Sequence, residues 1–219
     1  MSNPHRVLSV FVLLLLSFFA AVEASAQSTF QISFGPLFTV DSTADSNDVN
    51  VGNGVCADAD GRCTLRAAIE ESNYEPVANV ASINIIIFAL PQPAVIELTR
   101  GELTITAGVW IFGPGARRLT VQRSSDPGTA AFRIFHIAAG NGGVEIRRLS
   151  IRNGNAGSGN GGGILVEENS GLSLKDLAIT ENSAANGGGI ANASRSFFAE
   201  RLLISSNTAV ANGGGIFSQ

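Results

Sequence analysis

The chain has 219 residues, a formal net charge of −4 and 15% charged residues. Its 14 Lys and Arg side chains are scattered and form no basic stripe, so nucleic acid is not an expected partner. The length allows one elongated domain or two small ones.

Residues 1–26 are predicted to be a signal peptide. Arg6 supplies a positive charge, residues 7–22 are almost wholly apolar, and Ala24-Ser25-Ala26 is a small-residue cleavage signal. A membrane anchor fits less well, because the apolar run is short and no positive cluster follows it. We expect cleavage after Ala26 and a secreted or cell-surface protein, with no transmembrane segment in the mature chain.

Residues 27–80 are predicted to form a cap region. Cys56 and Cys63 lie close together in it, and export favours a disulfide between them. The surrounding loop is acidic, and its aspartates are Asp41, Asp45, Asp48, Asp58 and Asp60. A structural Ca²⁺ near Asp58 and Asp60 remains an open alternative, although the spacing is not that of an EF-hand.

A short helix is predicted from Thr64 to Asn73, because Leu65, Ala68 and Ile69 share one face. Thr64 is a good N-cap residue, but Ala67 stands where a capping box needs Glu. We therefore expect Thr64 to cap the helix alone. A helix with one apolar face, placed just before the repeats, is suited to cover the open end of a solenoid.

Residues 81–219 are predicted to form an all-β domain, a right-handed parallel β-helix. The sequence Asn-Gly-Gly-Gly-Ile occurs at 160–164, 186–190 and 212–216, with a period of 26 residues. Apolar and polar residues alternate in the segment before each glycine block, as in strands with one buried face. The alternating apolar positions are Val144, Ile146, Leu149 and Ile151, then Leu172, Leu174, Leu177 and Ile179, then Phe197, Ala199, Leu202 and Ile204. Such short strands bury their apolar faces only when successive coils stack on one another.

Each coil is predicted to contain three strands. Pairs of outward residues, such as Arg147-Arg148, mark a bend between the first two strands, and Ile164 with Val166 marks the third. The glycines permit a sharp corner, and the preceding asparagines can stack into an amide ladder. Upstream, short apolar segments from Ile83 to Val121 predict less regular first coils.

By the same pattern, the chain reaches Gln219 in the middle of a coil, so the repeat domain is expected to be truncated there. The last apolar layer, with Phe197, Leu202 and Ile204, is then expected to lie near an exposed edge. Unpaired backbone groups at such an edge favour self-association through the C-terminal end.

Two segments resemble known families. The run Cys63-Thr64-Leu65-Arg66-Ala67-Ala68-Ile69 resembles the motif of the CSLREA domain, and Phe38-Thr39-Val40 and residues 111–115 match the layout of that family. The resemblance extends over nearly the whole mature chain and implies an exported bacterial protein whose N-terminal motif leads into β-helix repeats. The unit from Asn182 to Ile190 is similar to repeats of polymorphic outer-membrane proteins, which implies a surface adhesin of the bacterial outer membrane.

No catalytic residue, cofactor or metal ligand is predicted. Lyases and hydrolases need paired carboxylates or a poised base. His136 is the only histidine after the signal peptide, and it alternates with apolar neighbours, so a solvated outward side chain is expected. The other candidates are interpreted as surface charge, and they are Glu167, Glu168, Asp176 and Glu181.

The glycines Gly157, Gly159 and Gly162 match the dinucleotide-binding pattern G-x-G-x-x-G. That motif requires a helix directly after it, whereas Ile164-Leu165-Val166 predicts a strand. The match therefore does not indicate a cofactor.

We expect a non-catalytic secreted or cell-surface protein with an adhesin-like interaction role or a stalk role. Its extracellular ligand, a glycan or a host or matrix protein, is not readable from the sequence. The alternative is an extracellular carbohydrate-active β-helix enzyme, a polysaccharide lyase or hydrolase. Carboxylates converging on one lateral groove would favour the enzyme, whereas scattered Ser, Thr and Asn rows favour binding or a stalk.

Overall fold

The computed structural model describes residues 33–74, 82–138 and 143–219. The predicted signal peptide lies outside these ranges. The described residues form a parallel β-solenoid of about five coils, preceded by a single short helix. This confirms the predicted all-β solenoid with a helix-containing cap.

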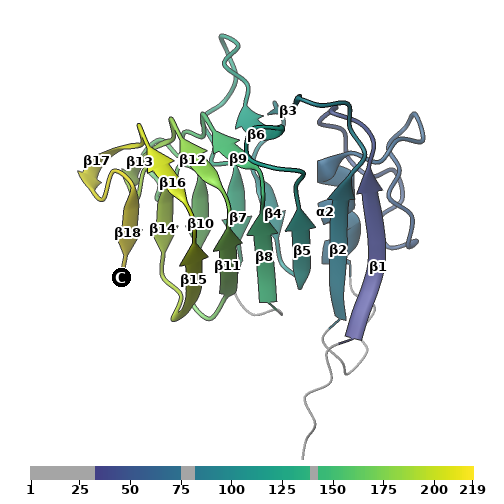
Figure 1. Ribbon diagram of the computed structural model, residues 1–219. Coiled ribbons are helices and arrows are strands. Elements are labelled where there is room, and N and C mark those ends of the chain that lie inside the picture. Colours follow the sequence, from purple (N-terminus) through teal and green to yellow (C-terminus); the bar gives the residue numbers. More distant parts are fainter. Residues whose placement is uncertain (1–32, 75–81, 139–142) are drawn as a thin grey trace, which may run out of the picture. The chain divides into compact units, whose positions relative to one another are not determined.

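Three parallel sheets run along the solenoid, and each coil contributes one strand to each of them (Figure 1). Sheet A consists of β1 (Ser33–Val40), β2 (Ser82–Phe88), β5 (Val109–Phe112), β8 (Gly143–Arg147), β11 (Gly171–Lys175) and β15 (Ser196–Glu200). Sheet B consists of β3 (Ala94–Leu98), β6 (Leu119–Arg123), β9 (Ser150–Arg152), β12 (Ala178–Thr180) and β16 (Leu203–Ser205). Sheet C consists of β4 (Leu103–Ile105), β7 (Phe135–Ile137), β10 (Ile164–Val166), β14 (Ile190–Asn192) and β18 (Ile216–Ser218).

The last two coils each contain a fourth strand, so the prediction of three strands per coil is wrong there. The strands are β13 (Ser183–Asn186) and β17 (Thr208–Asn212), which pair in parallel. Their sequences are rich in Ser, Thr, Ala and Asn and lack the apolar alternation that reveals the other strands. Backbone hydrogen bonds between coils, which do not depend on apolar side chains, hold these strands together.

The predicted core ladders are confirmed. Leu172 is in register with Val144 and with Phe197. Ile179, which is fully buried, is in register with Ile151 and Ile204. Apolar positions therefore stack coil upon coil and form one continuous core.

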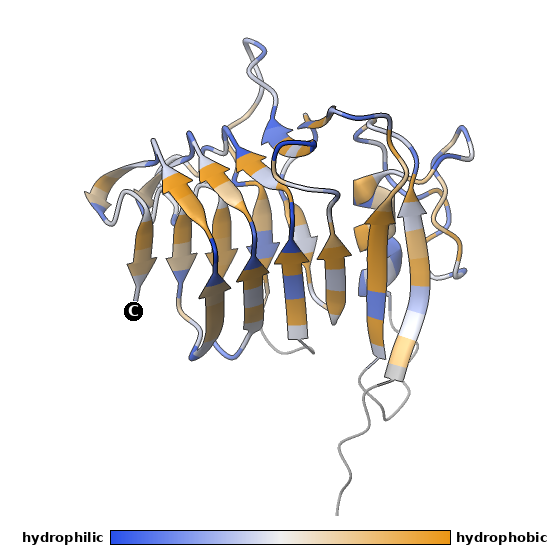
Figure 2. Ribbon diagram, viewed as in Figure 1, coloured by the Kyte–Doolittle hydropathy of each residue, from blue (hydrophilic) through white to orange (hydrophobic). Residues whose placement is uncertain are grey.

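The predicted bends between sheets A and B are also present. Figure 2 shows hydrophilic residues at the ends of β8, β11 and β15, where the chain turns from sheet A to sheet B. Arg148, Asp176 and Arg201 adopt left-handed backbone conformations at these bends, with φ of 61°, 55° and 51°. The same strained geometry recurs in three coils, which shows that the bend is part of the repeat.

The asparagines that precede the glycine blocks form the predicted amide ladder. Asn186 donates from its side-chain amide to Asn160 at 3.0 Å, and Asn212 donates to Asn186 at 2.9 Å. A second ladder lies inside, where the buried Asn182 donates to Asn207 at 3.0 Å. These bonds satisfy polar groups that stacking would otherwise leave without partners.

The glycine blocks are required by the close approach of neighbouring coils. The first glycine of each block, at 161, 187 and 213, has a φ between 62° and 67°. In the first two blocks the second glycine, at 162 and 188, has no room for a side chain either. A Cβ on Gly188 would lie 2.3 Å from the carbonyl oxygen of Thr208 and 2.6 Å from that of Gly214. The carbonyl oxygen of Gly214 accepts the backbone N–H of Gly189 at 3.1 Å and the N–H of Thr208 donates to Asn182 at 2.8 Å, so hydrogen bonds between the coils hold both segments in place.

We expect Gly188→Ala to destabilise the protein by about 1–3 kcal/mol, because the added methyl group forces two coils apart. Gly143→Ala is the matched control, since a Cβ at Gly143 meets no atom within 4 Å and the backbone there is not left-handed. The control should change stability by less than about 0.5 kcal/mol. Urea unfolding of the two variants and the parent measures both effects, and equal midpoints would contradict the close packing.

The last coil is less covered than the coils before it. Ile216 is 42% exposed, whereas Ile190, its register partner, is fully buried. Phe197 and Ile204 are only partly buried. The expected exposed apolar edge is therefore present in the described residues, and self-association through it stays a prediction.

The N-terminal cap is formed by β1, the acidic loop and helix α2 (Leu65–Asn73). Strand β1 pairs in parallel with β2 and so begins sheet A. The hydroxyl of Thr64 accepts the backbone N–H of Ala67 at 3.0 Å, which confirms that Thr64 caps the helix. The predicted disulfide is present between Cys56 and Cys63, whose Cα atoms are 5.1 Å apart.

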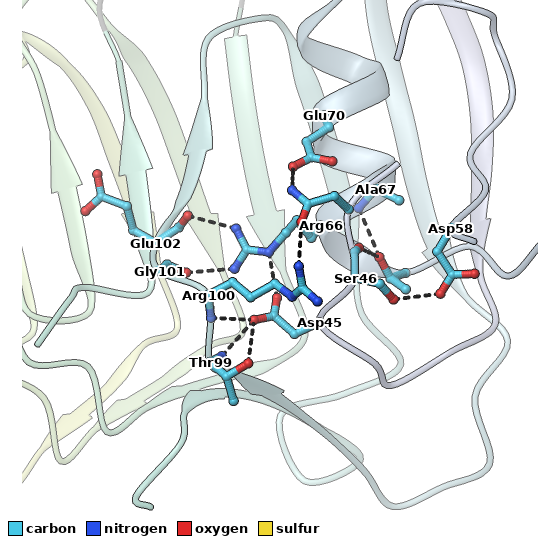
Figure 3. A network of polar contacts seen from close by, with 12 residues as sticks. Asp45, Ser46, Asp58, Arg66, Ala67, Glu70, Thr99, Arg100, Gly101 and Glu102 are labelled. Atoms are coloured by element: carbon cyan, nitrogen blue, oxygen red, sulfur yellow. Dashed lines mark hydrogen bonds and ion pairs between the residues drawn. The ribbon is translucent and has the colours of Figure 1, made fainter. Parts of the chain in front are cut away.

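A buried arginine connects the helix to the first coil (Figure 3). The Nε of Arg66 lies 2.7 Å from a carboxylate oxygen of Asp45, and the two side chains are 9% and 5% exposed. Arg66 also donates to the carbonyl oxygens of Gly101 at 2.7 Å and Glu102 at 3.2 Å. Because all these groups are satisfied by one another, the pair fixes the helix against the solenoid.

In the ranges that the structure describes, no helix is long and apolar enough to cross a membrane.

Candidate functional site

The acidic loop of the cap uses its carboxylates to hold its own backbone. Asp58 accepts the hydroxyl of Ser46 at 2.6 Å and the backbone N–H groups of Asp60 and Arg62 at 3.0 and 2.9 Å. The hydrogen bond from Ser46 lowers the pKa of Asp58, and those from the backbone act in the same direction. Across the described residues, no group of three His, Cys, Asp or Glu side chains is arranged to hold a metal ion. The contacts of Asp58 are explained by the loop itself, so they do not support the calcium alternative.

His136 differs from its expected environment. It lies at an outward position of β7, as predicted, but its side chain is only 18% exposed. Its Nδ1 lies 2.9 Å from Glu102 and its Nε2 lies 2.7 Å from Glu167. Glu102 is itself paired with Arg133 at 2.9 Å. The expectation of a solvated histidine is therefore wrong, because residues of neighbouring coils enclose it.

This arrangement favours a structural role for His136. Both ring nitrogens face carboxylates, and both can donate only when the ring carries its second proton. The hydrogen bond to Glu102 raises the pKa of His136, and the bond to Glu167 acts in the same direction. The hydrogen bond from His136 in turn lowers the pKa of Glu102. A general base needs a free nitrogen lone pair, and the two carboxylates favour the protonated ring, which lacks one.

The linkage between pKa and stability predicts how His136 contributes at different pH. Because the folded protein raises the pKa of His136, this residue contributes to the free energy of unfolding. The contribution is complete below the unfolded pKa of 6.5 and is lost as the pH rises through the folded pKa. Glu102, whose pKa is lowered, contributes stability above its unfolded pKa of 4.5, and this contribution is lost as the pH falls. The ion cluster therefore stabilises the fold most between these two values.

We expect His136→Gln to reduce stability clearly more at about pH 5.5 than at about pH 9, because the contribution of a raised pKa is lost as the pH rises. Urea unfolding of parent and variant at both pH values measures the difference. A loss of stability that does not depend on pH would show that the ring acts only through packing.

Two of the remaining predicted surface charges are in ion pairs on the outside of the bends, whereas Glu168 lines a hollow beside Ser194. Asp176 pairs with Arg201 at 2.5 Å, and Glu181 pairs with Arg152 at 2.7 Å. Asp176 and Glu181 have side chains that are 40% and 50% exposed, in agreement with the interpretation as surface charge. The carboxylates considered from the sequence therefore do not converge on one groove.

The strongest candidate for a binding site is a groove over the outward face of sheet A, which we call the sheet A groove. It has a volume of about 410 Å³, and its lining includes residues of β5, β8, β11 and β15, which are neighbouring strands of sheet A (Figure 1). Its outward lining residues are Trp110, Gly143, Glu145, Gly171, Ser173, Arg195, Ser196 and Phe198. Such a volume lies within the usual range for ligand pockets.

The floor of the sheet A groove is hollow because two outward positions are glycine. Gly143 and Gly171 are in register on β8 and β11, and neither has a left-handed backbone. A Cβ at Gly143 would meet no atom within 4 Å, and one at Gly171 would make only an ordinary contact at 3.9 Å. Unlike the glycines of the repeat blocks, these two are not required by close packing, since larger residues would fit and would favour a strand.

Aromatic rings border the groove. Trp110 packs at 5.4 Å, edge to face, against Phe34 and at 5.9 Å against Phe112. Phe198, on the other side of the groove, is 53% exposed. Sequence reasoning missed this site, and the only signal that could have suggested it was the outward position of Phe198 beside the inward Phe197.

The glycine pattern at residues 157–162 is followed by strand β10 and by no helix, as predicted. No family model, no curated protein and no solved structure matches this chain.

Proposed function

We propose that this is an exported, non-catalytic binding protein of the adhesin-like type, and that the sheet A groove holds its extracellular ligand. The observation that carries the proposal is the glycine floor between two aromatic borders. Gly143 and Gly171 leave open a space that the fold does not require to be open. A stalk without a ligand gives no reason for such a hollow.

The sequence supports export and surface location. The predicted signal peptide at residues 1–26 and the resemblance to CSLREA-domain proteins both indicate an exported bacterial protein. The disulfide between Cys56 and Cys63 is consistent with an oxidising compartment. The similarity to repeats of polymorphic outer-membrane proteins supports a role at the cell surface.

The lining of the groove favours binding over catalysis. Glu145 is its only carboxylate, and it has no His, Lys or Tyr. Glycoside hydrolysis ordinarily uses two carboxylates flanking the scissile bond. The cluster around His136 lines neither this groove nor another hollow, which lies beside Ser194. The carbohydrate-active enzyme is therefore the weaker candidate.

An array of glycans and matrix proteins tests the proposal. The protein used is the secreted form, and sequencing of its N-terminus checks the predicted cleavage after Ala26. Gly171→Tyr fills the groove, and Thr180→Tyr places the same side chain at an outward position of β12 in sheet B. We expect an array component that binds the parent and Thr180→Tyr and that Gly171→Tyr no longer binds. The proposal would be contradicted if Gly171→Tyr bound the component as tightly as the parent does, or if the protein released reducing or unsaturated sugar ends from any glycan.

A further inference from the structure

The sheet A groove also indicates a class of ligand, an inference that rests on the function proposed above. Trp110, Glu145, Ser173 and Phe198 lie in one register line across four neighbouring strands. With about 4.8 Å between neighbouring strands, this line is about 14 Å long. An aromatic ring stands at each end, and two hydrogen-bonding groups lie between them.

The two ends of the line suit the faces of sugar rings. A pyranose ring presents C–H groups on its faces and hydroxyl groups around its rim. It can therefore stack on an aromatic side chain while its rim reaches polar groups. Contacts with Phe34 and Phe112 brace Trp110, so this end is preorganised. Phe198 is exposed and supplies the second stacking surface.

The middle of the line offers a hydrogen-bond acceptor that the protein does not use. The Oε1 atom of Glu145 is buried and has no hydrogen-bond partner among the described residues. The Nη1 atom of Arg147 lies 3.4 Å away, which makes an ion pair without a hydrogen bond. The Glu145 side chain as a whole is 15% exposed, so its carboxylate can accept a ligand hydroxyl from the groove, although the Oε1 atom itself is closed to solvent. The neighbouring Ser173 can donate or accept.

A peptide fits the groove less well. Strands β5, β8 and β11 are each paired on both sides, so a peptide could add a strand only at the free edge of β15, which lies beside the groove and not along it. Extended peptides obtain much of their affinity from such main-chain bonds. The lining also has no arginine cluster for an acidic motif, since Arg195 is its only cation and Glu145 balances it.

An acidic glycan is also disfavoured at the centre. Arg147 is already engaged with Glu145 and with the ring of Phe112, so Arg195 is the only cation of the lining left for a ligand carboxylate. We infer that the groove binds a neutral oligosaccharide that lies along the solenoid, with sugar rings on Trp110 and Phe198 and a hydroxyl donating to Glu145.

Trp110 is the only tryptophan of the chain, so its fluorescence reports directly on the groove. The secreted protein is titrated with neutral gluco-, manno- and xylo-oligosaccharides and with uronic acid oligosaccharides of similar length. We expect a saturable fluorescence change with a neutral oligosaccharide. Gly171→Tyr and Phe198→Ala should each weaken its affinity about tenfold or more, which corresponds to about 1.4 kcal/mol. Phe198 is exposed, so its truncation leaves the fold intact.

Glu145→Gln keeps the size of the side chain and removes its charge, and it should also weaken binding about tenfold. Thr180→Tyr on sheet B should leave the affinity unchanged. If only uronic acid oligosaccharides or matrix proteins bind, and Gly171→Tyr abolishes that binding, the ligand class is wrong while the proposed binding function stands. The inference would be overturned if Gly171→Tyr and Phe198→Ala both bound the neutral saccharide as tightly as the parent does. It would also be overturned if the parent bound no component of the array.

Discussion

Replacing Ile179 by Asp is expected to destabilise the protein by more than about 4 kcal/mol. Ile179 is fully buried on β12 and stacks between Ile151 and Ile204. An ionised carboxylate at this position has no donor within the apolar ladder, so the chain must either protonate it or open a coil. Both responses lower the free energy of unfolding relative to the parent protein.

Thermal and urea unfolding measure this effect, with Thr180→Asp as the control. Thr180 is the next residue on the same strand and has an outward side chain, so Asp at this position remains in contact with water. The control should change stability by less than about 1 kcal/mol. Equal stability of Ile179→Asp and Thr180→Asp would be incompatible with an inward ladder at Ile179.

Removal of Arg66 is expected to have the second largest effect. Arg66→Met should destabilise the fold by about 3–5 kcal/mol, because it leaves the buried carboxylate of Asp45 without its cation. The carbonyl oxygens of Gly101 and Glu102 would lose their donors at the same time. The helix would then lose its main polar connection to the first coil.

Arg62→Met is the matched control for this experiment. Arg62 pairs with Asp41 at 3.2 Å, but the two side chains are 52% and 44% exposed. Exposed pairs of this kind contribute about 0–1 kcal/mol. Urea unfolding of both variants measures the contrast. A loss in Arg66→Met no greater than that in Arg62→Met would show that the buried pair does not hold the cap in place.

The regular coils were predictable from the sequence because their period is constant. Asn160, Asn186 and Asn212 recur every 26 residues, and the stacked Ile151, Ile179 and Ile204 follow at similar separations of 28 and 25 residues. The disulfide and the helix cap were predictable for a different reason, since both depend on residues near one another in the sequence. Cys56 with Cys63, and Thr64 with Ala67, are examples.

The environment of His136 was not predictable, because its partners come from irregular coils. Glu102 and Glu167 lie 34 and 31 residues away, and neither separation equals the repeat period. The same difficulty hides the sheet A groove. Trp110, Glu145 and Phe198 fall on one line only after unequal loops between the coils have been accounted for. The pairing of strands, and not the sequence pattern, brings these residues together.

The fourth strands were missed because their side chains carry no pattern. Ala184 is the only buried residue of β13, and the strand is defined by its parallel pairing with β17. The sequence identifies the glycines of the repeat blocks by their period, but it does not show that the glycines of the groove floor leave open space. The distinction requires the neighbouring atoms, which crowd Gly188 and leave Gly143 open.

The central claim is that the sheet A groove is the binding site, and its most direct test is a nuclear magnetic resonance titration. Trp110 is the only tryptophan, so the protein has a single indole N–H signal. Titration with the oligosaccharide that changes its fluorescence most should shift this signal together with the backbone amides of Gly143, Gly171 and Ser173. The amides of sheet B should stay in place. Shifts confined to sheet B or to the cap, with an unmoved indole signal, would contradict the account.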